Sequence, residues 1–197
     1  MSIDKRWYAA IVLVVLALAW RLFNYQLMIA PGLELVTAVS LVAAVMLPRR
    51  AALVVPLAIM AAGDLVLGNS PILAFTWSAF ALIGLSGLIL KRWQKGRLIL
   101  ASIAGGALSA FFFFAYTNFG VWLTSGMYAH TWAGLVDCYV MALPFYRMNL
   151  IGNLIAVPAF MSVAVYGPAF VRQTRLILAA MSESSASFMR GPSTEDR

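Results

Sequence analysis

Charged residues are scarce in this chain of 197 residues: they make up 11% of it, while 63% of the residues are hydrophobic. A soluble domain of this size needs far more polar surface to stay dispersed in water. The single cysteine excludes an internal disulfide and any metal site built from several cysteines. The composition therefore predicts one all-α domain that is integral to a membrane.

Acidic residues are also few, 7 against 14 lysines and arginines, which gives a net charge of +7. A surplus of this size is common in proteins that bind nucleic acid. Here, however, the basic residues stand in short clusters between apolar runs, and such clusters are the signals that orient membrane helices. We therefore expect the lipid bilayer, and no nucleic acid, as the partner of these basic residues.

Six apolar runs approach the length of about 20 residues that a helix needs to cross roughly 30 Å of hydrocarbon. They cover about residues 7–29, 33–48, 51–68, 71–90, 98–117 and 147–171. The segment 118–146 between the last two is more polar and is interrupted by Gly120, Gly126, Gly134 and Pro144, so we expect it to be partly helical and extracytoplasmic. The predicted architecture is a domain of six transmembrane helices in residues 1–175, followed by a polar cytoplasmic tail over residues 176–197.

The basic residues predict the orientation of these helices. Only Arg21 and Arg147 stand apart from a set of twelve that would all lie on one side of the membrane, namely Lys5, Arg6, Arg49, Arg50, Lys91, Arg92, Lys95, Arg97, Arg172, Arg175, Arg190 and Arg197. Basic residues remain on the cytoplasmic side. We therefore expect both termini inside, in a bacterial inner membrane.

Polar and charged residues collect at the opposite, outer end of the predicted bundle. A charged group at membrane depth is costly unless it is paired or hydrated, so it marks a cavity or an ion pair. The stretch TSGMYAHTWAGLVDCY, residues 124–139, holds the only histidine and the only cysteine. We expect it to be the lid or wall of an outward-facing pocket. The predicted substrate-binding residues are Arg21, Asn24, Asp64, Asn118, Trp122, Tyr128, His130, Trp132, Asp137, Cys138 and Arg147.

Structural ion pairs are an alternative role for the charged members of this set. Arg21 has two possible partners, Glu34 and Asp64. Arg147 has one, Asp137. Pairs of this kind at membrane depth satisfy each other's charge without any ligand.

Plainer roles are also open for the uncharged members. Tyr128 and Trp132 fit an aromatic belt at the membrane interface. His130 fits an interfacial residue that only forms hydrogen bonds. Cys138 fits a small packing residue.

No motif in the sequence indicates an enzyme. Ser125, His130 and Asp137 lie close together, but the serine lacks the G-x-S-G context of rhomboid proteases and its histidine is only five residues away. Asp64 follows Gly63 as in the G-x-G-D motif of intramembrane aspartyl proteases, yet Ala61 replaces the first glycine. Phosphate loops, metal triads and haem motifs are also missing from the sequence. We therefore expect a non-catalytic protein.

Small residues recur at four-residue spacing in the run 98–117. One stripe is Ala101, Gly105 and Ser109, and the other is Ser102, Gly106 and Ala110. Small residues at this spacing let another helix approach closely. The neighbouring helix belongs either to this chain or to another protein.

Several short motifs resemble those of a family of small bacterial membrane proteins. They are Ala62-Gly63-Asp64-Leu65, the T-N-x-x-x-W element from Thr117 to Trp122, A-L-P-F from Ala142 to Phe145, and N-L-I-G-N from Asn149 to Asn153, with Tyr128, Gly134-Leu135 and Cys138 between them. The resemblance covers about residues 15–170. That family is similar in size and predicted topology to the substrate-binding S components of energy-coupling-factor (ECF) transporters.

The resemblance implies a six-helix bundle that captures a vitamin or a metal ion on its outer side, with the first connection as a gate. ATP would then come from an ECF-type energising module. S components commonly dock on that module through an A-x-x-x-A pattern in the first helix, whereas here the pattern within a predicted helix runs from Ala58 to Ala62. Some cobalamin-specific S components use a cysteine as cobalt ligand, so the resemblance makes cobalamin a candidate ligand at Cys138.

These features favour small-molecule uptake, of a vitamin-like compound or a metal, through a substrate-binding membrane protein similar to an S component. The alternative is a non-catalytic accessory subunit of a larger membrane complex. The small-residue stripes and the displaced docking pattern favour that alternative.

Overall fold

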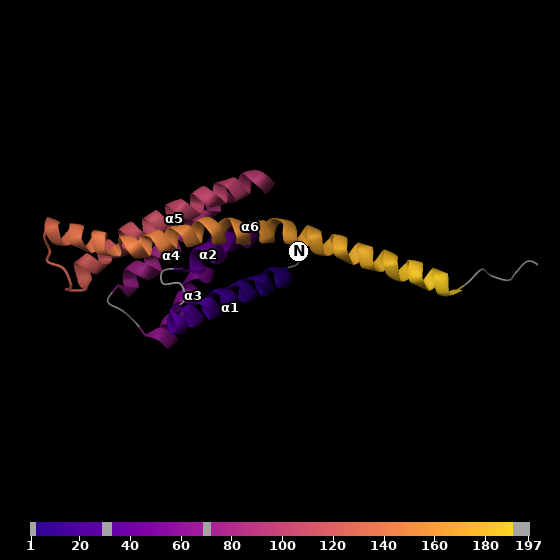
Figure 1. Cartoon of the computed structure of the whole chain (residues 1–197), viewed down its shortest axis with the longest axis horizontal. Coiled ribbons are helices and arrows are strands. Elements are labelled where there is room, and N and C mark those ends of the chain that lie inside the picture. The colour runs from indigo at the N-terminus through magenta and orange to yellow at the C-terminus, as the bar shows by residue number, and fades with distance from the viewer. Residues whose placement is uncertain (1–2, 29–32, 69–71, 191–197) are drawn as a thin grey trace, which may run out of the picture. The chain divides into compact units, whose positions relative to one another are not determined.

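The computed structural model describes residues 3–28, 33–68 and 72–190, and these residues form helices and connections without a strand. The helices are α1 (Ile3–Leu27), α2 (Val36–Met46), α3 (Ala51–Leu67), α4 (Leu73–Leu90), α5 (Lys95–Thr124) and α6 (Trp132–Arg190) (Figure 1). Four of them, α1, α4, α5 and α6, are long and apolar enough to cross a membrane. The all-α prediction is confirmed, and the chain is a multi-pass membrane protein.

The chain divides into two units, residues 1–161 and residues 162–197. The helix α6 contributes to both. In the second unit, helix continues to Arg190, and the side chains of residues 168–182 are exposed. The predicted tail, which begins at residue 176, is therefore helical as far as Arg190.

The helix α2 lies at the centre of the first unit. Nine of its eleven residues are buried, and it packs against α1, α3, α4 and α5. At 1.5 Å per residue α2 is about 16 Å long, roughly half the thickness of the hydrocarbon. The run 33–48, predicted as a transmembrane helix, is thus a shorter helix whose apolar residues meet other helices on every side.

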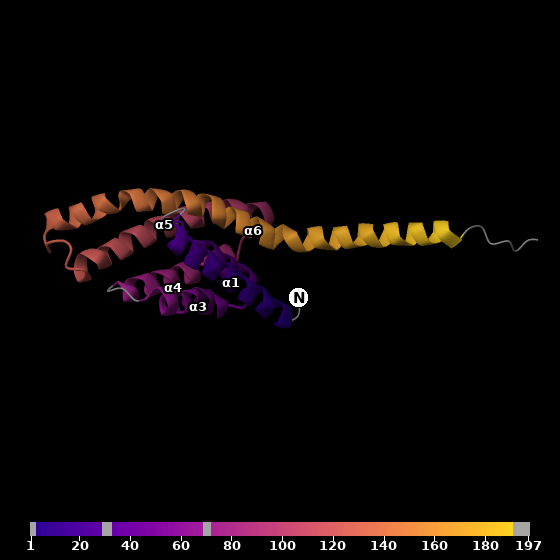
Figure 2. The ribbon, with the colours of Figure 1, turned by 60° about the horizontal axis from the view of Figure 1, so that its bottom comes forward.

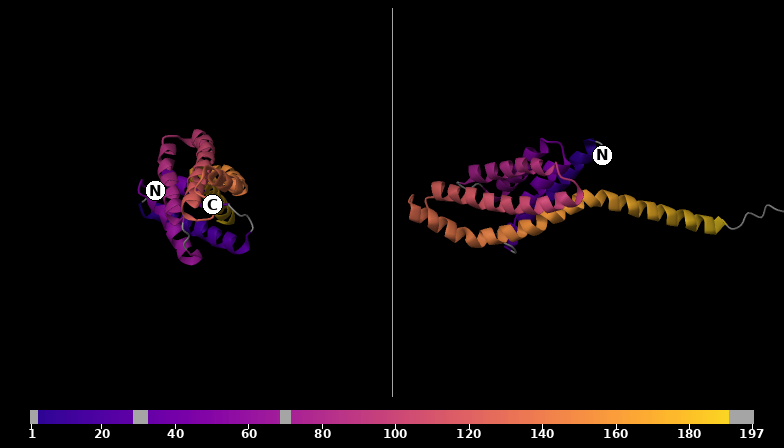
Figure 3. Two further views of the ribbon diagram at one scale, coloured as in Figure 1. Left: turned by 90° about the vertical axis from the view of Figure 1, so that its left-hand side faces the viewer. Right: turned by 90° about the horizontal axis from the view of Figure 1, so that it is seen from above.

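The helix α5 and the first part of α6 lie alongside each other and are joined by a short connection (Figures 2 and 3). Since α5 ends at Thr124 and α6 begins at Trp132, most of the segment 118–146 is regular helix. The segment is thus partly helical, as predicted, but its helical parts are the end of α5 and the start of α6 and not a separate element. A proline is tolerated inside membrane helices when neighbouring groups satisfy the freed backbone, and Pro144 lies inside α6.

The other residue that suggested a break, Gly134, lies in the first turn of α6. Its N–H donates to the hydroxyl oxygen of Thr131 at 3.2 Å. A threonine hydroxyl in this position caps a helix by accepting from one of the first free backbone N–H groups. Gly134 therefore takes part in the start of α6 and does not interrupt it.

The two small-residue stripes of α5 have different surroundings. Ser102, Gly106 and Ala110 are buried, and a Cβ atom on Gly106 would lie 3.0 Å from the carbonyl oxygen of Asn153 in α6. This stripe lets α6 approach, so packing within the chain is confirmed for it. The other stripe lines a groove of about 800 Å³ between α2, α4 and α5, and its members are Ala101, Gly105 and Ser109.

The contact between α3 and α4 depends on Gly84, because a methyl group there would collide with the backbone carbonyl of Ala52. We predict that Gly84→Ala lowers the thermal midpoint of the detergent-solubilised protein, since overpacking typically costs about 1–3 kcal/mol. The matched control is Gly96→Ala in α5, where the added methyl meets open space and favours helix. An unchanged midpoint for Gly84→Ala would contradict the close packing of these helices.

Candidate functional site

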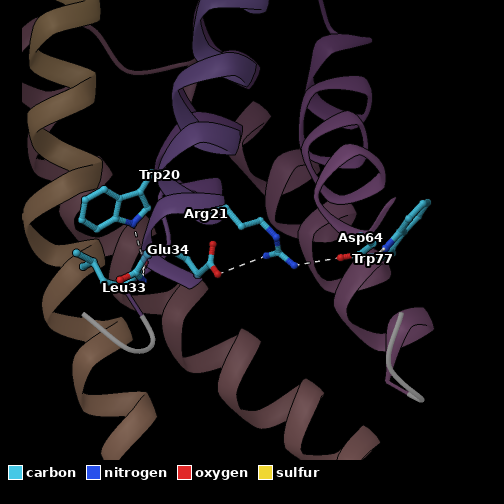
Figure 4. A network of polar contacts seen from close by, with 7 residues as sticks. Trp20, Arg21, Leu33, Glu34, Asp64 and Trp77 are labelled. Carbon is cyan, nitrogen blue, oxygen red and sulfur yellow. Dashed lines mark hydrogen bonds and ion pairs between the residues drawn. The ribbon is translucent and has the colours of Figure 1, made fainter. Parts of the chain in front are cut away.

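Arg21 of α1 lies between two carboxylates (Figure 4). Its Nη1 is 3.4 Å from Oε1 of Glu34, and its Nη2 donates to Oδ1 of Asp64 at 3.1 Å. The other oxygen of Asp64 accepts from Nε1 of Trp77 in α4 at 2.7 Å. The exposed fractions of the Arg21 and Asp64 side chains are only 16% and 11%. Both pairings predicted for Arg21 are therefore confirmed.

Gly63 makes room for the guanidinium of Arg21. A Cβ atom at this position of α3 would lie 2.7 Å from Nε and 3.0 Å from Cδ of Arg21. A larger residue would displace Arg21 from its path to Asp64. The Gly63-Asp64 pair of the sequence thus has a structural use: the glycine admits the arginine and the aspartate binds it.

The connection before α2 is fixed against α1, and this positions Glu34. The carbonyl oxygen of Leu33 accepts from Nε1 of Trp20 at 2.9 Å and from Nδ2 of Asn24 at 3.4 Å. Gly152 of α6 lies against the side chain of Leu33 from the other side. Glu34 is therefore held beside Arg21 by backbone contacts as well as by its own charge.

A cavity of about 300 Å³ adjoins this network, with walls from α1, α3, α4, α5, α6 and the connection that carries Glu34. Most of its lining is apolar, with several phenylalanine rings. The polar side chains in the lining include Arg21, Glu34, Thr76, Thr117, Asn118 and Tyr146. A cavity of this volume is at the lower end of the range for ligand pockets, and an apolar wall with a few convergent polar groups is typical of them.

The charges of the network do not balance, because one guanidinium faces two carboxylates. Oε2 of Glu34 and Nε of Arg21 are buried without a hydrogen-bond partner among the described residues. Burial raises the pKa of Glu34, and although Arg21 opposes this, Asp64 adds to it. Glu34 therefore binds a proton at a higher pH than an exposed glutamate does.

Four of the predicted binding residues belong to this region. Arg21 and Asn118 line the cavity. Asp64 binds Arg21, and Asn24 donates to the Leu33 carbonyl beside Glu34.

Four of the predicted binding residues, Trp122, Tyr128, His130 and Trp132, lie elsewhere, around the connection between α5 and α6. Nε1 of Trp122 donates to the carbonyl of Ala129 at 2.9 Å, and its ring meets that of His130 edge to face at 5.3 Å. His130 is exposed and Trp132 is 83% exposed, while Tyr128 is half-buried. The lining of the 300 Å³ cavity includes none of these four residues.

The remaining three predicted residues are in α6. Asp137 and Arg147 are both exposed, and ten residues of helix separate them by about 15 Å. The predicted ion pair between them is wrong, because the two lie on one continuous helix. Cys138 is buried, and its Sγ donates to the carbonyl oxygen of Asn118 at 3.4 Å, so it packs α6 against α5.

Several residues that line the cavity were not among the predicted binding residues. Glu34 was considered only as an ion-pair partner. Tyr146 and Asn149 also line the cavity, and the ring of Phe114 stacks on that of Tyr146 at 4.6 Å between centroids. A sequence signal existed, since Tyr146 and Asn149 are three residues apart and so share a helix face. The predicted helix begins at residue 147, so it leaves out Tyr146 and hides the face that Tyr146 shares with Asn149.

Removing Arg21 should destabilise the protein, because it leaves two carboxylates together without their cation. We predict that Arg21→Met lowers the thermal midpoint in detergent by the equivalent of about 3–5 kcal/mol, as expected for breaking a buried pair. Adding Asp64→Asn should recover part of the loss. Arg147→Met is the matched control, because it removes an exposed arginine of α6. Additive losses in the double variant would show that Arg21 and Asp64 do not interact.

Comparison of the chain with curated proteins and with solved structures gave no match. A family model does match, over residues 1–175. The matched region contains α1 to α5, the part of α6 that packs on α5, and every residue of the Arg21 network and its cavity. The chain therefore belongs to DUF6580, a family of unknown function.

Proposed function

We propose that this protein binds a small organic molecule in the cavity beside Arg21 and Glu34 and takes part in its uptake across a bacterial inner membrane. The observation that carries the proposal is a cavity of about 300 Å³ whose apolar walls surround two charged side chains. Charged groups in a membrane bundle mark ligand or ion pathways when they line a cavity. An ion pair with a purely structural role has no need of the adjoining space.

The resemblance to S components supports a substrate-binding subunit that obtains its energy from an ECF-type module or another membrane complex. The ligand that we propose is smaller than cobalamin, since a corrinoid exceeds a cavity of this volume. Cys138, the candidate cobalt ligand, does not line the cavity. In the described part of the chain, no three His, Cys, Asp or Glu side chains come together as a metal site. We therefore favour uptake of an organic molecule over uptake of a metal ion.

Blocking the cavity tests this function. Ala142 lines it, and we predict that Ala142→Phe abolishes retention of the small molecule that mass spectrometry detects in the purified protein. Ala133→Phe adds the same ring to an exposed position of the same helix, and it should leave retention unchanged. The proposal is wrong if the protein retains the same molecule in equal amount after Ala142→Phe.

The groove of about 800 Å³ between α2, α4 and α5 favours the second candidate, an accessory subunit of a larger complex. Its lining combines Ala101 and Gly105 with exposed apolar residues such as Leu82 and Leu108, and small residues let a foreign helix approach. Purification in mild detergent separates the two candidates. An accessory subunit brings a stoichiometric partner protein, and a solitary binding protein does not.

We also propose that the chain crosses the membrane six times, with the short α2 and its connections forming the second crossing, and that both termini are cytoplasmic, as the basic residues predict. In a Cys138→Ser background, a membrane-impermeant thiol reagent should label Met127→Cys in intact cells, because the α5–α6 connection would face outward. Gln94→Cys, in the α4–α5 connection, should react only after lysis. Met127 and Gln94 are both exposed, so accessibility within the protein does not bias the comparison. Labelling of Gln94→Cys in intact cells would contradict this orientation.

A further inference from the structure

The charged cluster beside the cavity has a surplus of negative charge. Arg21 from α1 supplies one positive charge, and Glu34 and Asp64 supply two negative charges when both are ionised. The side chains that α4 and α5 contribute to the lining carry no charge, and the only titratable group from α6 is Tyr146. Since charges in low-dielectric surroundings must be balanced, the cluster has room for one more cation.

The polar atoms of the wall are mainly acceptors. The hydroxyl of Thr76 donates its proton to the carbonyl of Leu73 at 3.0 Å, and that of Thr117 donates to Phe113 at 2.7 Å. Each hydroxyl oxygen therefore has only lone pairs left for a ligand. The amide nitrogen of Asn118 donates one of its two protons to the backbone carbonyl of Phe114 at 2.7 Å, so this side chain can still accept or donate.

Glu34 adds the strongest acceptor to this set. Its Oε2 is buried and has no partner in the described part of the chain. The corresponding donor is Nε of Arg21, which is also unpartnered. Three groups can only accept, namely Oε2 of Glu34 and the hydroxyls of Thr76 and Thr117, while Nε of Arg21 is the one charged donor. The side chains of Asn118 and Tyr146 can do either, so the lining suits a ligand that donates hydrogen bonds.

Aromatic rings complete the wall. Phe80, Phe113, Phe114, Phe145 and Tyr146 all line the cavity, and pairs of these rings are already in contact, Phe80 with Phe113 at 4.8 Å between centroids and Phe114 with Tyr146 at 4.6 Å. The faces of aromatic rings attract cations, most strongly where water is excluded. They also pack well against the apolar part of an organic molecule.

From these three features we infer that the cavity selects small organic cations, namely protonated amines or quaternary ammonium compounds with an apolar body. The inference deepens the proposed function and rests on it, because it names the class of molecule that the cavity binds. The ammonium group lies at Oε2 of Glu34, and the apolar body lies among the phenylalanine rings.

A proton and the ligand then compete for Glu34. Protonation of its carboxyl group balances the cluster without any ligand, and the raised pKa of Glu34 favours that state. As the pH falls through the pKa of Glu34, the site loses its negative charge and affinity for a cation falls with it. Amines of ordinary basicity remain protonated over this range, so the change in affinity reports on the protein.

Three molecules with one carbon skeleton test the inference: 2-phenylethylammonium, the neutral 2-phenylethanol and the anion phenylacetate. Binding is measured by calorimetry on the purified protein at pH 8 and at successively lower pH. We expect the ammonium compound to bind at least about tenfold more tightly than the other two, because it alone brings a positive charge to a charge-assisted hydrogen bond with the Glu34 carboxylate. Its affinity should decline as the pH is lowered.

Two variants locate the effect. Glu34→Gln keeps an acceptor for Arg21 but loses the charge, so it should retain the thermal midpoint while losing both the cation preference and its pH dependence. Asp137→Asn removes the same charge from an exposed position of α6 and should keep both. Should Glu34→Gln fail to fold, the pH dependence of the wild-type protein still tests the role of a carboxylate.

Several outcomes would overturn the inference. Equal or tighter binding of the alcohol or of phenylacetate would show that the cavity binds small molecules but does not select cations. A cation preference that survives in Glu34→Gln would place the selectivity elsewhere. If none of the three molecules binds, the inference is wrong, and the Ala142→Phe comparison decides separately whether the cavity holds another ligand.

Discussion

The contact of Arg21 with two carboxylates determines how the first unit is arranged at one end of its helices. The guanidinium joins α1 to the connection before α2 and to α3, and Trp77 extends the contact to α4. Leaving any of these charges unpaired at membrane depth would cost several kcal/mol. The helices must therefore meet in the register that pairs them, and glycine at position 63 is what admits the arginine.

The cavity follows from this arrangement. Glu34 stands before α2, and the buried core begins two residues later at Val36. Because α2 is short, the connection before it reaches inward between the helices. Glu34 of this connection meets the side chain of Arg21, and Leu33 meets Gly152 of α6. The space left between this connection, α4, α5 and α6 is lined by aromatic rings and by the hydroxyls of Thr76 and Thr117, which already donate their protons to backbone carbonyls.

The sequence predicted much of the fold and part of the site. Hydropathy located α1, α2, α3 and α4 within a few residues, and the cost of a lone charge in a membrane predicted both partners of Arg21. Hydropathy did not reveal that α2 is buried, because a helix buried among other helices is as apolar as one that faces lipid. The ends of α5 and α6 were not predicted, because polar side chains and Pro144 in residues 118–146 indicate an interruption, whereas helix continues through most of them.

The misplaced pocket shows a second limit of sequence patterns. Residues 124–139 have the highest density of versatile side chains, yet several of them contact the end of α5, as His130 contacts Trp122 and Cys138 contacts Asn118. The cavity instead takes its lining from five helices and from the connection that carries Glu34, and no short stretch of sequence displays such a set. What singles it out is an imbalance that appears only in three dimensions: two carboxylates beside one guanidinium, with one oxygen of Glu34 left unpartnered among the described residues. A network needed only for stability would be better served by a single carboxylate, since each added buried charge costs free energy. Binding of a ligand is therefore the simplest physical reason for the second carboxylate.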